Sequence, residues 1–154
     1  MLKMNNKIKI LIQISLIGII VFIISTFFFQ ICFVKGSSMM PTLKDGQILI
    51  AKKFNLHIKN NDIVVIKKDN KIMIKRVIGI PNDKISIIDG YVYVNGIKND
   101  DRYIQNPGNL IQEIILNDKE YFVLGDNRNA SIDSRFEEIG IIFKNEIIAI
   151  IVLN

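Results

Sequence analysis

Ser38 is the first residue of this chain whose surroundings suggest chemistry. It lies in the segment Gly36-Ser37-Ser38-Met39-Met40-Pro41-Thr42, between a glycine and a proline. Glycine lets a backbone approach a bound molecule closely, and proline fixes the direction in which the chain leaves. A serine held on such a rigid turn can act as a nucleophile, with backbone amides nearby to bind an oxyanion. The same segment also fits an ordinary loop, so the hypothesis needs a base to support it.

Lys75 is the candidate base. The single histidine, His57, has no companion residue and fits a surface or half-buried position better than a catalytic one. A lysine can replace histidine when burial disfavours its charged form. In the run 71–78, strand alternation places Lys75 on the same face as Met73 and Val77, which predicts an apolar pocket around its amine. For a lysine considered alone, a surface position would be the ordinary expectation.

An uncharged segment over residues 10–34 precedes the serine turn. It is longer than the roughly 20 apolar residues that cross a hydrocarbon layer, and it is apolar on every side. We predict a transmembrane helix there, and one that stays attached, because the bulky residues 29–33 do not resemble a signal-peptide cleavage site. The flanking Lys3, Lys7 and Lys9 place the N-terminus in the cytoplasm by the positive-inside rule.

Beyond this anchor, short alternating runs separated by Gly, Asn and Asp predict a mainly β fold. The predicted organisation is a cytoplasmic N-terminus (1–9), a transmembrane anchor (10–34) and an extracytoplasmic domain (35–154). Asp69-Asn70 and Asp89-Gly90 each separate two runs and suit tight hairpin turns. The predicted strands cover residues 47–52, 62–67, 71–78, 84–88, 91–94, 111–116, 121–124 and 146–153, with an exposed loop at 106–109.

Composition limits the other possibilities. A chain of 154 residues that is 49% hydrophobic can form one domain with a real core. Its formal charge is +5, but Lys3, Lys7 and Lys9 supply three of these charges, and the remaining Lys and Arg residues are mixed with acids, so we expect no nucleic-acid partner. One cysteine and one histidine exclude an internal disulfide and a Cys/His zinc cluster, and we expect neither metal nor cofactor. Cys32 is interpreted as membrane packing, because bulky residues precede it and do not fit a lipid-attachment site.

Three segments, in this order, resemble the type I signal peptidases. Residues 36–43, Gly-Ser-Ser-Met-Met-Pro-Thr-Leu, are similar to the nucleophile box Gly-x-Ser-Met-x-Pro-Thr-Leu. Residues 75–83, Lys-Arg-Val-Ile-Gly-Ile-Pro-Asn-Asp, resemble the general-base box. Residues 125–135, Gly-Asp-Asn-Arg-Asn-Ala-Ser-Ile-Asp-Ser-Arg, resemble the box that supports the site. Residues 89–96 resemble a hairpin of the family, so the resemblance covers nearly the whole chain, and its compact form is similar to the Gram-positive type.

The resemblance implies that Ser38 attacks the scissile carbonyl, that Lys75 takes its proton and that Ser131 orients the lysine amine. The supporting charged residues that it implies are Asp133 and Arg135 as a pair and Asp126 as a structural carboxylate. It further implies a membrane-bound serine endopeptidase with a signal-peptidase-type β domain, which removes N-terminal signal peptides without a cofactor. The implied partners are secretory pre-proteins and the lipid bilayer, at the cell membrane.

The chain departs from the family pattern at three positions. Gly36 stands where some members carry a hydroxyl that helps the oxyanion hole, so the hole must be formed by backbone amides such as that of Ser38. Ala130 replaces a more usual Asn beside Ser131. Asn82 replaces Gly after the base, a mild change because Asn tolerates positive φ.

Two other interpretations are considered. One is a soluble Ser/Lys repressor that cuts its own linker, which the anchor and the segment 125–135 argue against. The other is a membrane-tethered β module that binds a partner, in which Ser38 and Lys75 are incidental. Labelling of Ser38 by a serine-directed acylating probe distinguishes an enzyme from such a module.

Overall fold

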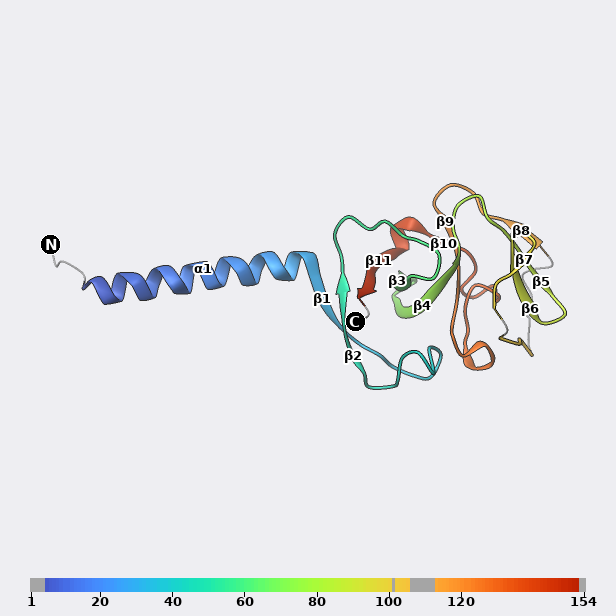
Figure 1. Ribbon diagram of the computed structural model, residues 1–154, viewed down its shortest axis with the longest axis horizontal. Coiled ribbons are helices and arrows are strands. Elements are labelled where there is room, and N and C mark those ends of the chain that lie inside the picture. The colour runs from blue at the N-terminus through green and yellow to red at the C-terminus, as the bar shows by residue number, and fades with distance from the viewer. Residues whose placement is uncertain (1–4, 101, 106–112, 153–154) are drawn as a thin grey trace.

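A computed structural model describes residues 5–100, 102–105 and 113–152 of the chain. It consists of one long helix followed by two antiparallel sheets, which confirms the prediction of a mainly β fold with one N-terminal apolar helix. The helix projects away from the β domain as a single arm (Figure 1). The active-site segments all lie in the β domain, at the loops and strand ends described below.

Helix α1 (Asn6–Phe28) begins where the Asn5 side chain accepts a hydrogen bond from the backbone N–H of Lys7. None of its residues is buried, and it is long and apolar enough to cross a membrane. The prediction of a helix over residues 10–34 is wrong at its C-terminal end, because the helix ends at Phe28. Residues Phe29–Phe33 form strand β1, because their backbone groups pair with a neighbouring strand instead of with the preceding helical turn.

The larger sheet contains seven strands in the order β1-β2-β11-β3-β4-β9-β10, and all neighbours are antiparallel. Besides β1, its strands are β2 (Ile48–Lys52), β3 (Ile63–Lys68), β4 (Lys71–Gly79), β9 (Glu120–Leu124), β10 (Ile142–Phe143) and β11 (Ile147–Val152). The smaller sheet has the order β7-β6-β5-β8, with β5 (Lys84–Ile88), β6 (Tyr91–Val94), β7 (Ile97–Lys98) and β8 (Glu113–Ile115). Two 3-10 helices complete the fold, η1 (Arg128–Ala130) and η2 (Lys144–Glu146).

Each of the eight predicted strand runs overlaps an observed strand. The two predicted hairpin turns are also confirmed, with positive φ at Asp69, Asn70, Asp89 and Gly90 between paired strands. The predictions missed β1, β7 and β10. The predicted loop at 106–109 and the first residues of the predicted strand at 111–116 lie outside the described residues.

The core lies on both faces of the larger sheet and between the two sheets. Neighbouring residues of β3 illustrate the alternation, because Val65 belongs to the hydrophobic cluster on one face and Val64 to the cluster on the other. The first cluster also takes in Met39 and Leu43, which flank the segment after Ser38. The serine turn is thus packed directly onto the sheet.

Candidate active site

The turn that carries Ser38 is held at both ends. Val34 N–H donates to the carbonyl of Gln47, and Gly46 N–H donates back to the carbonyl of Val34, each at 2.9 Å. After the serine, the side chain of Met39 is fully buried in the core. Before it, Gly36 adopts φ +88°, which favours glycine, and its N–H donates to Asp45 Oδ1 at 2.7 Å. Ser38 itself stays half-buried between these fixed points.

A loop that follows β9 packs against this turn. The backbone N–H of Asn127 donates to the carbonyl of Ser38 at 2.9 Å, and the Asn127 side chain donates to the carbonyl of Ser37 at 3.3 Å. Gly125 allows this approach, because a side-chain carbon there would collide with Ser131 and would lie 2.5 Å from the Ser38 carbonyl oxygen. The missing side chain thus lets the segments of Ser38 and Ser131 meet.

Lys75 lies on β4 with only 4% of its surface exposed. Its Nζ donates to Ser131 Oγ at 2.8 Å. Met73 and Val77 belong to one hydrophobic cluster, on the face of β4 to which Lys75 points by strand alternation. Burial lowers the pKa of the Lys75 amine; the carboxylate of Asp133 opposes this shift.

Asp133 and Arg135 form an ion pair beneath the same loop, and their side chains are 0% and 1% exposed. Arg135 Nε donates to Asp133 Oδ1 at 2.7 Å, and Arg135 Nη2 donates to Oδ2 at 2.9 Å. Arg135 Nη2 also donates to the backbone carbonyls of Arg128 and Ser131, while Asp133 accepts from the N–H of Gly125 at 3.0 Å. The pair therefore fixes both ends of the loop that presents Ser131 to Lys75.

Asp126 pairs with the residue that follows Lys75 on β4. Arg76 donates to both carboxylate oxygens of Asp126, at 2.7 and 2.6 Å. Burial by itself raises the pKa of Asp126, but hydrogen bonds from Arg76 and Thr42 and the charge of Arg102 outweigh burial and lower the pKa below its usual value. Asp126 thus ties the loop that follows β9 to the strand that carries the lysine.

The sequence interpretation missed a third ion pair at this site, between the buried Arg128 and the partly exposed Asp100. Arg128, with 3% of its surface exposed, donates to Asp100 at 2.7 and 3.3 Å and to the carbonyl of Gly125 at 3.2 Å. Arg102 contacts both Asp100 and Asp126, and so joins the Asp100–Arg128 pair to the Asp126–Arg76 pair. Arg128 lies inside the segment 125–135, which resembles the supporting box of the family, so the sequence could have indicated that it supports the site. Asp100 has no such signal, because its partner is 28 residues away.

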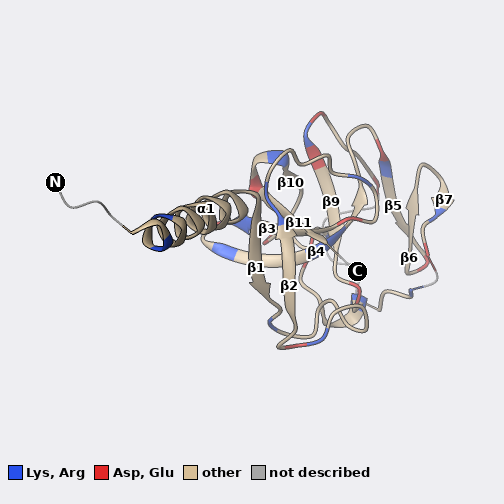
Figure 2. Ribbon diagram, turned by 60° about the vertical axis from the view of Figure 1, so that its left-hand side comes forward, with Lys and Arg blue, Asp and Glu red and all other residues tan. Residues whose placement is uncertain are grey.

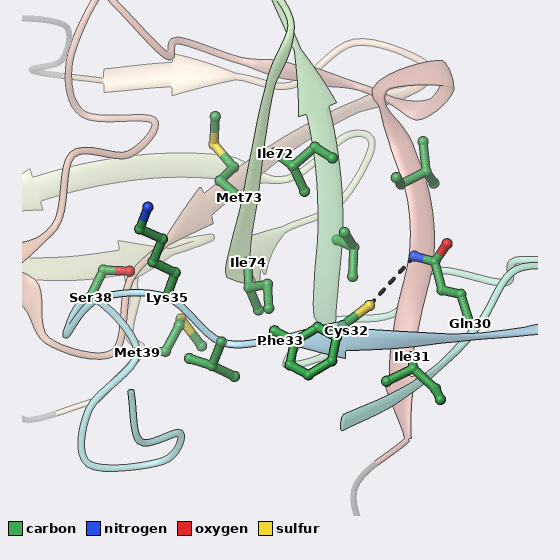
Figure 3. Close-up of a pocket in the computed structure, with 13 residues that line it drawn as sticks. Gln30, Ile31, Cys32, Phe33, Lys35, Ser38, Met39, Ile72, Met73 and Ile74 are labelled. Carbon is green, nitrogen blue, oxygen red and sulfur yellow. Dashed lines mark hydrogen bonds between the residues drawn. The ribbon is translucent and has the colours of Figure 1, made fainter. Parts of the chain in front are cut away.

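A cleft of about 370 Å³ leads away from Ser38. In Figure 3, Ser38 and Met39 lie at one end and Gln30 at the other, with Ile74 of β4 facing Cys32 of β1. The walls are largely apolar, and two of them are strands, so the cleft has the shape and lining for an extended peptide. Cys32 lines this cleft and packs against the core, rather than lying in the membrane helix as predicted.

Two other candidate bases can be compared with Lys75. Lys35 also lines the cleft near Ser38, but it is exposed, whereas Lys75 is buried (Figure 3). His57 is exposed on the segment between β2 and β3, where its ring nitrogen contacts the carbonyl of Asn55 at 3.3 Å.

Within residues 5–100, 102–105 and 113–152, no group of three or more His, Cys, Asp or Glu residues could hold a metal ion.

Comparison with known proteins places this arrangement among peptidases. The family model described as signal peptidase, peptidase S26, matches residues 7–153. Signal peptidase I U of Bacillus subtilis (strain 168) is 35% identical over 151 residues, which cover 87% of this chain and 81% of the relative. Signal peptidase IB of Staphylococcus aureus is 33% identical, covering 90% and 83%. A crystal structure of a signal peptidase I from Enterococcus faecalis V583 covers 63% of this chain and 98% of its own, with a TM-score of 0.50 and 23% identity, which supports the fold.

Proposed function

This chain belongs to the signal peptidase family, peptidase S26, and on that premise we propose that Ser38 is its nucleophile and Lys75 its general base. It is a serine endopeptidase that removes signal peptides from secreted proteins. Membership of this family leaves no support for a self-cleaving repressor or for a purely binding module. The proposal assigns the steps of that reaction to residues of this chain.

One observation carries the assignment of the base. The Lys75 amine is buried and is held by Ser131 Oγ at 2.8 Å, on the loop that also holds the Ser38 carbonyl. A neutral amine that donates one hydrogen to Ser131 keeps a lone pair to accept the proton of Ser38. Lys35 is exposed, and among the described residues it has no hydrogen-bond partner like Ser131, so it is the weaker candidate.

The proposed reaction proceeds by acyl transfer. Ser38 Oγ attacks the scissile carbonyl carbon, and its proton passes to Lys75 Nζ. The resulting ammonium returns that proton to the leaving amine as the peptide C–N bond breaks, which leaves an ester on Ser38. Water, losing a proton to the neutral amine of Lys75, then attacks the ester carbonyl, and the ammonium returns that proton to Ser38 Oγ as the acyl–oxygen bond breaks. The Ser38 N–H has no acceptor among the described residues, so it is available to the oxyanion.

The substrate is proposed to lie extended in the cleft, with the signal-peptide residues before the cut between β1 and β4. Met39, Val34 and Ile74 line the part of the cleft near Ser38 and would form shallow apolar pockets there. Such pockets accept small side chains at the positions just before the scissile bond. This matches the small residues that the family resemblance implies at the first and third positions before the cut.

The membrane arrangement is also a proposal. Helix α1 would span the bilayer with Lys7 and Lys9 at its cytoplasmic end, and the β domain would lie outside (Figure 2). Since β1 follows α1 without a linker, the extracytoplasmic domain is proposed to begin at Phe29 rather than at residue 35. The cleft then lies close to the membrane surface, where a precursor held by its signal peptide would present its cleavage region.

The test is to incubate the detergent-solubilised protein with a secretory precursor and to sequence the new N-terminus of the product. Ser38→Ala and Lys75→Ala are expected to lower kcat by more than about 10³-fold, because the two residues act as one unit. Lys35→Ala is the matched control and should retain most activity. Near-normal turnover by Lys75→Ala, together with loss in Lys35→Ala, would move the base to Lys35.

A further inference from the structure

Gln30 supplies the one carboxamide among the described residues that line the cleft. It is the second residue of β1, whose other residues are Phe, Ile, Cys and Phe, and its side chain is half-buried. Gln30 also lines a separate groove of about 500 Å³ beside the last turns of α1. It therefore stands where the surroundings of the helix end and the cleft toward Ser38 begins.

The hydrogen-bonding capacity of this side chain is only partly used. Gln30 Nε2 donates to Cys32 Sγ at 3.5 Å (Figure 3). A thiol sulfur is a weak acceptor, and a carboxamide nitrogen carries two N–H donors. Among the described residues, Gln30 Nε2 has no other acceptor and Oε1 has no donor. At least one N–H of Gln30 is thus available to a molecule that enters the cleft.

The enzyme's own chain shows what a change from helix to strand requires at this level. Helix α1 ends at Phe28, and β1 begins at the next residue. The last carbonyl groups of a helix have no partner within the helix. Here the carbonyl of Phe28 accepts a hydrogen bond from the backbone N–H of Lys53 at 2.8 Å, and the carbonyl of Ser25 accepts one from the N–H of Phe29. Donors placed at the end of the helix therefore stabilise the transition.

A signal peptide bound to this enzyme has to make the same change. Its hydrophobic segment is helical in the bilayer, because backbone polar groups there must be satisfied within the segment. Its residues before the cut are proposed to lie extended in the cleft. Between these two parts, the carbonyl groups of the last helical turn lose their partners. They do so at the end of the cleft nearest α1, where Gln30 lies.

We infer that Gln30 Nε2 donates a hydrogen bond to a backbone carbonyl of the signal peptide, at the residue where its helix changes to extended chain. An extended chain that runs from Ser38 back along β1 to Gln30 contains roughly five residues, at about 3.3 Å each. The contacted carbonyl is therefore about five residues before the cut. This inference rests on the proposed function and on the proposed anchoring of α1.

Such a contact selects substrates by geometry rather than by side chain. A backbone carbonyl is present in every residue, so Gln30 accepts any residue at the contacted position. It favours a signal peptide whose helix ends at Gln30 and whose extended part then reaches Ser38 with the scissile bond. Gln30 is a substrate-binding residue in this assignment and takes no part in the bond-breaking steps.

The test compares two peptide substrates of the full chain in the same detergent. The long peptide contains the hydrophobic segment and the cut, and the short peptide begins at the third residue before the cut. Gln30→Met keeps the length of the side chain and removes its donor. It should raise KM for the long peptide about fivefold with little change in kcat, and leave the short peptide unaffected. Gln105→Met, at an exposed glutamine outside the cleft, is the matched control.

The acceptor is identified by esters in the long peptide. One peptide bond at a time, from the fourth to the seventh residue before the cut, is replaced by an ester, whose carbonyl is a weaker acceptor. At one position the ester should raise KM of the parent about as much as Gln30→Met does, and combining the two changes should add nothing further. The same pattern is expected in Kd when both peptides are bound by Ser38→Ala and by Ser38→Ala with Gln30→Met.

Three results would overturn the inference while the proposed function stands. An unchanged KM for the long peptide in Gln30→Met would remove the contact. Equal losses on the long and the short peptide would show that Gln30 supports β1 rather than the substrate. Additive effects of Gln30→Met and of every ester would show that its donor does not bind a substrate carbonyl. Failure of the parent chain to cut either peptide would instead refute the proposed function, and the inference with it.

Discussion

In the proposed mechanism, the chemistry depends on whether the amine of Lys75 carries a proton. Burial lowers the pKa of Lys75, and Asp133 and Arg135 act on it in opposite directions. A lysine base is active only when neutral, so a lowered pKa moves the onset of activity from strongly alkaline pH toward neutrality. The same burial lowers stability below the usual lysine pKa near ~10.4, because the unfolded chain binds a proton there that the folded site resists.

The first prediction is a single ascending limb in kcat/KM as pH rises, set by Lys75 in the free enzyme. It is measured with a peptide substrate in the parent and in two variants. His57→Ala should keep the limb, because this residue is exposed on a segment away from the described site contacts. Ser131→Ala should lower the rate, because the amine loses its fixed partner. Disappearance of the limb in His57→Ala would make the histidine the base and refute the Ser38/Lys75 dyad.

A second residue-scale prediction concerns the pair of Asp100 and Arg128. Asp100→Asn leaves the buried Arg128 guanidinium without its carboxylate and should lower the free energy of unfolding by about 1–3 kcal/mol. It should also reduce kcat, because Arg128 holds the Gly125 carbonyl in the loop of Ser131. Asp118→Asn, at an exposed turn position, is the matched control for both measurements. Unchanged unfolding and turnover in Asp100→Asn would show that the pair is not needed.

The site residues that could be predicted from the sequence are those that lie in short segments with recognisable neighbours. Ser38 and Lys75 each lie in a short segment with recognisable neighbours, and Ser131 lies in a third. The contact of the Lys75 amine with Ser131 joins residues 56 positions apart, so only the family resemblance could connect them. Asp100 could not be found, because an aspartate in the polar run 98–102 resembles any surface acid until its partner is placed beside it.

At the scale of elements, the sequence signal was clear where side chains alternate. All eight predicted strand runs overlap an observed strand, including β4, which carries Lys75. β1 was missed because it continues the uncharged run of the helix with no charged or turn residue between them, so the two were predicted as one element. β7 and β10 have two residues each, too few to produce any period.

The position of β1 leads to a prediction about truncation. A chain that begins at Phe29 keeps β1 paired with β2 and should cleave a soluble peptide with kcat/KM close to that of the full chain in the same detergent. A chain that begins at residue 35 loses a wall of the cleft and exposes the edge of β2, so its activity should fall sharply. Circular dichroism of both chains separates loss of fold from loss of the cleft. Equal activity would show that β1 does not contribute to substrate binding.

At the scale of the whole molecule, the two ends of α1 differ in charge. Lys7 and Lys9 lie in its first turn, and the last turn has no basic residue. We predict that a membrane-impermeant thiol reagent added to intact cells labels Ile97→Cys but not Asn5→Cys, each in a Cys32→Ser background. Labelling of Asn5→Cys only after lysis is the control. The reverse pattern would place the β domain in the cytoplasm and contradict the proposed orientation.

The single-armed shape of the molecule also predicts how much the anchor contributes to delivery (Figure 1). An enzyme and a precursor confined to the same membrane surface meet at a much higher effective concentration than two molecules of which one is free in solution. The full chain in vesicles should therefore process a membrane-inserted precursor about 10²-fold faster than the chain that begins at Phe29 at equal bulk concentration. The two should differ little on a soluble peptide, because the cleft of both is built from the same strands. The full-length Ser38→Ala variant measures background proteolysis. Equal rates on the membrane-inserted precursor would show that α1 holds the enzyme at the membrane without helping it reach its substrate.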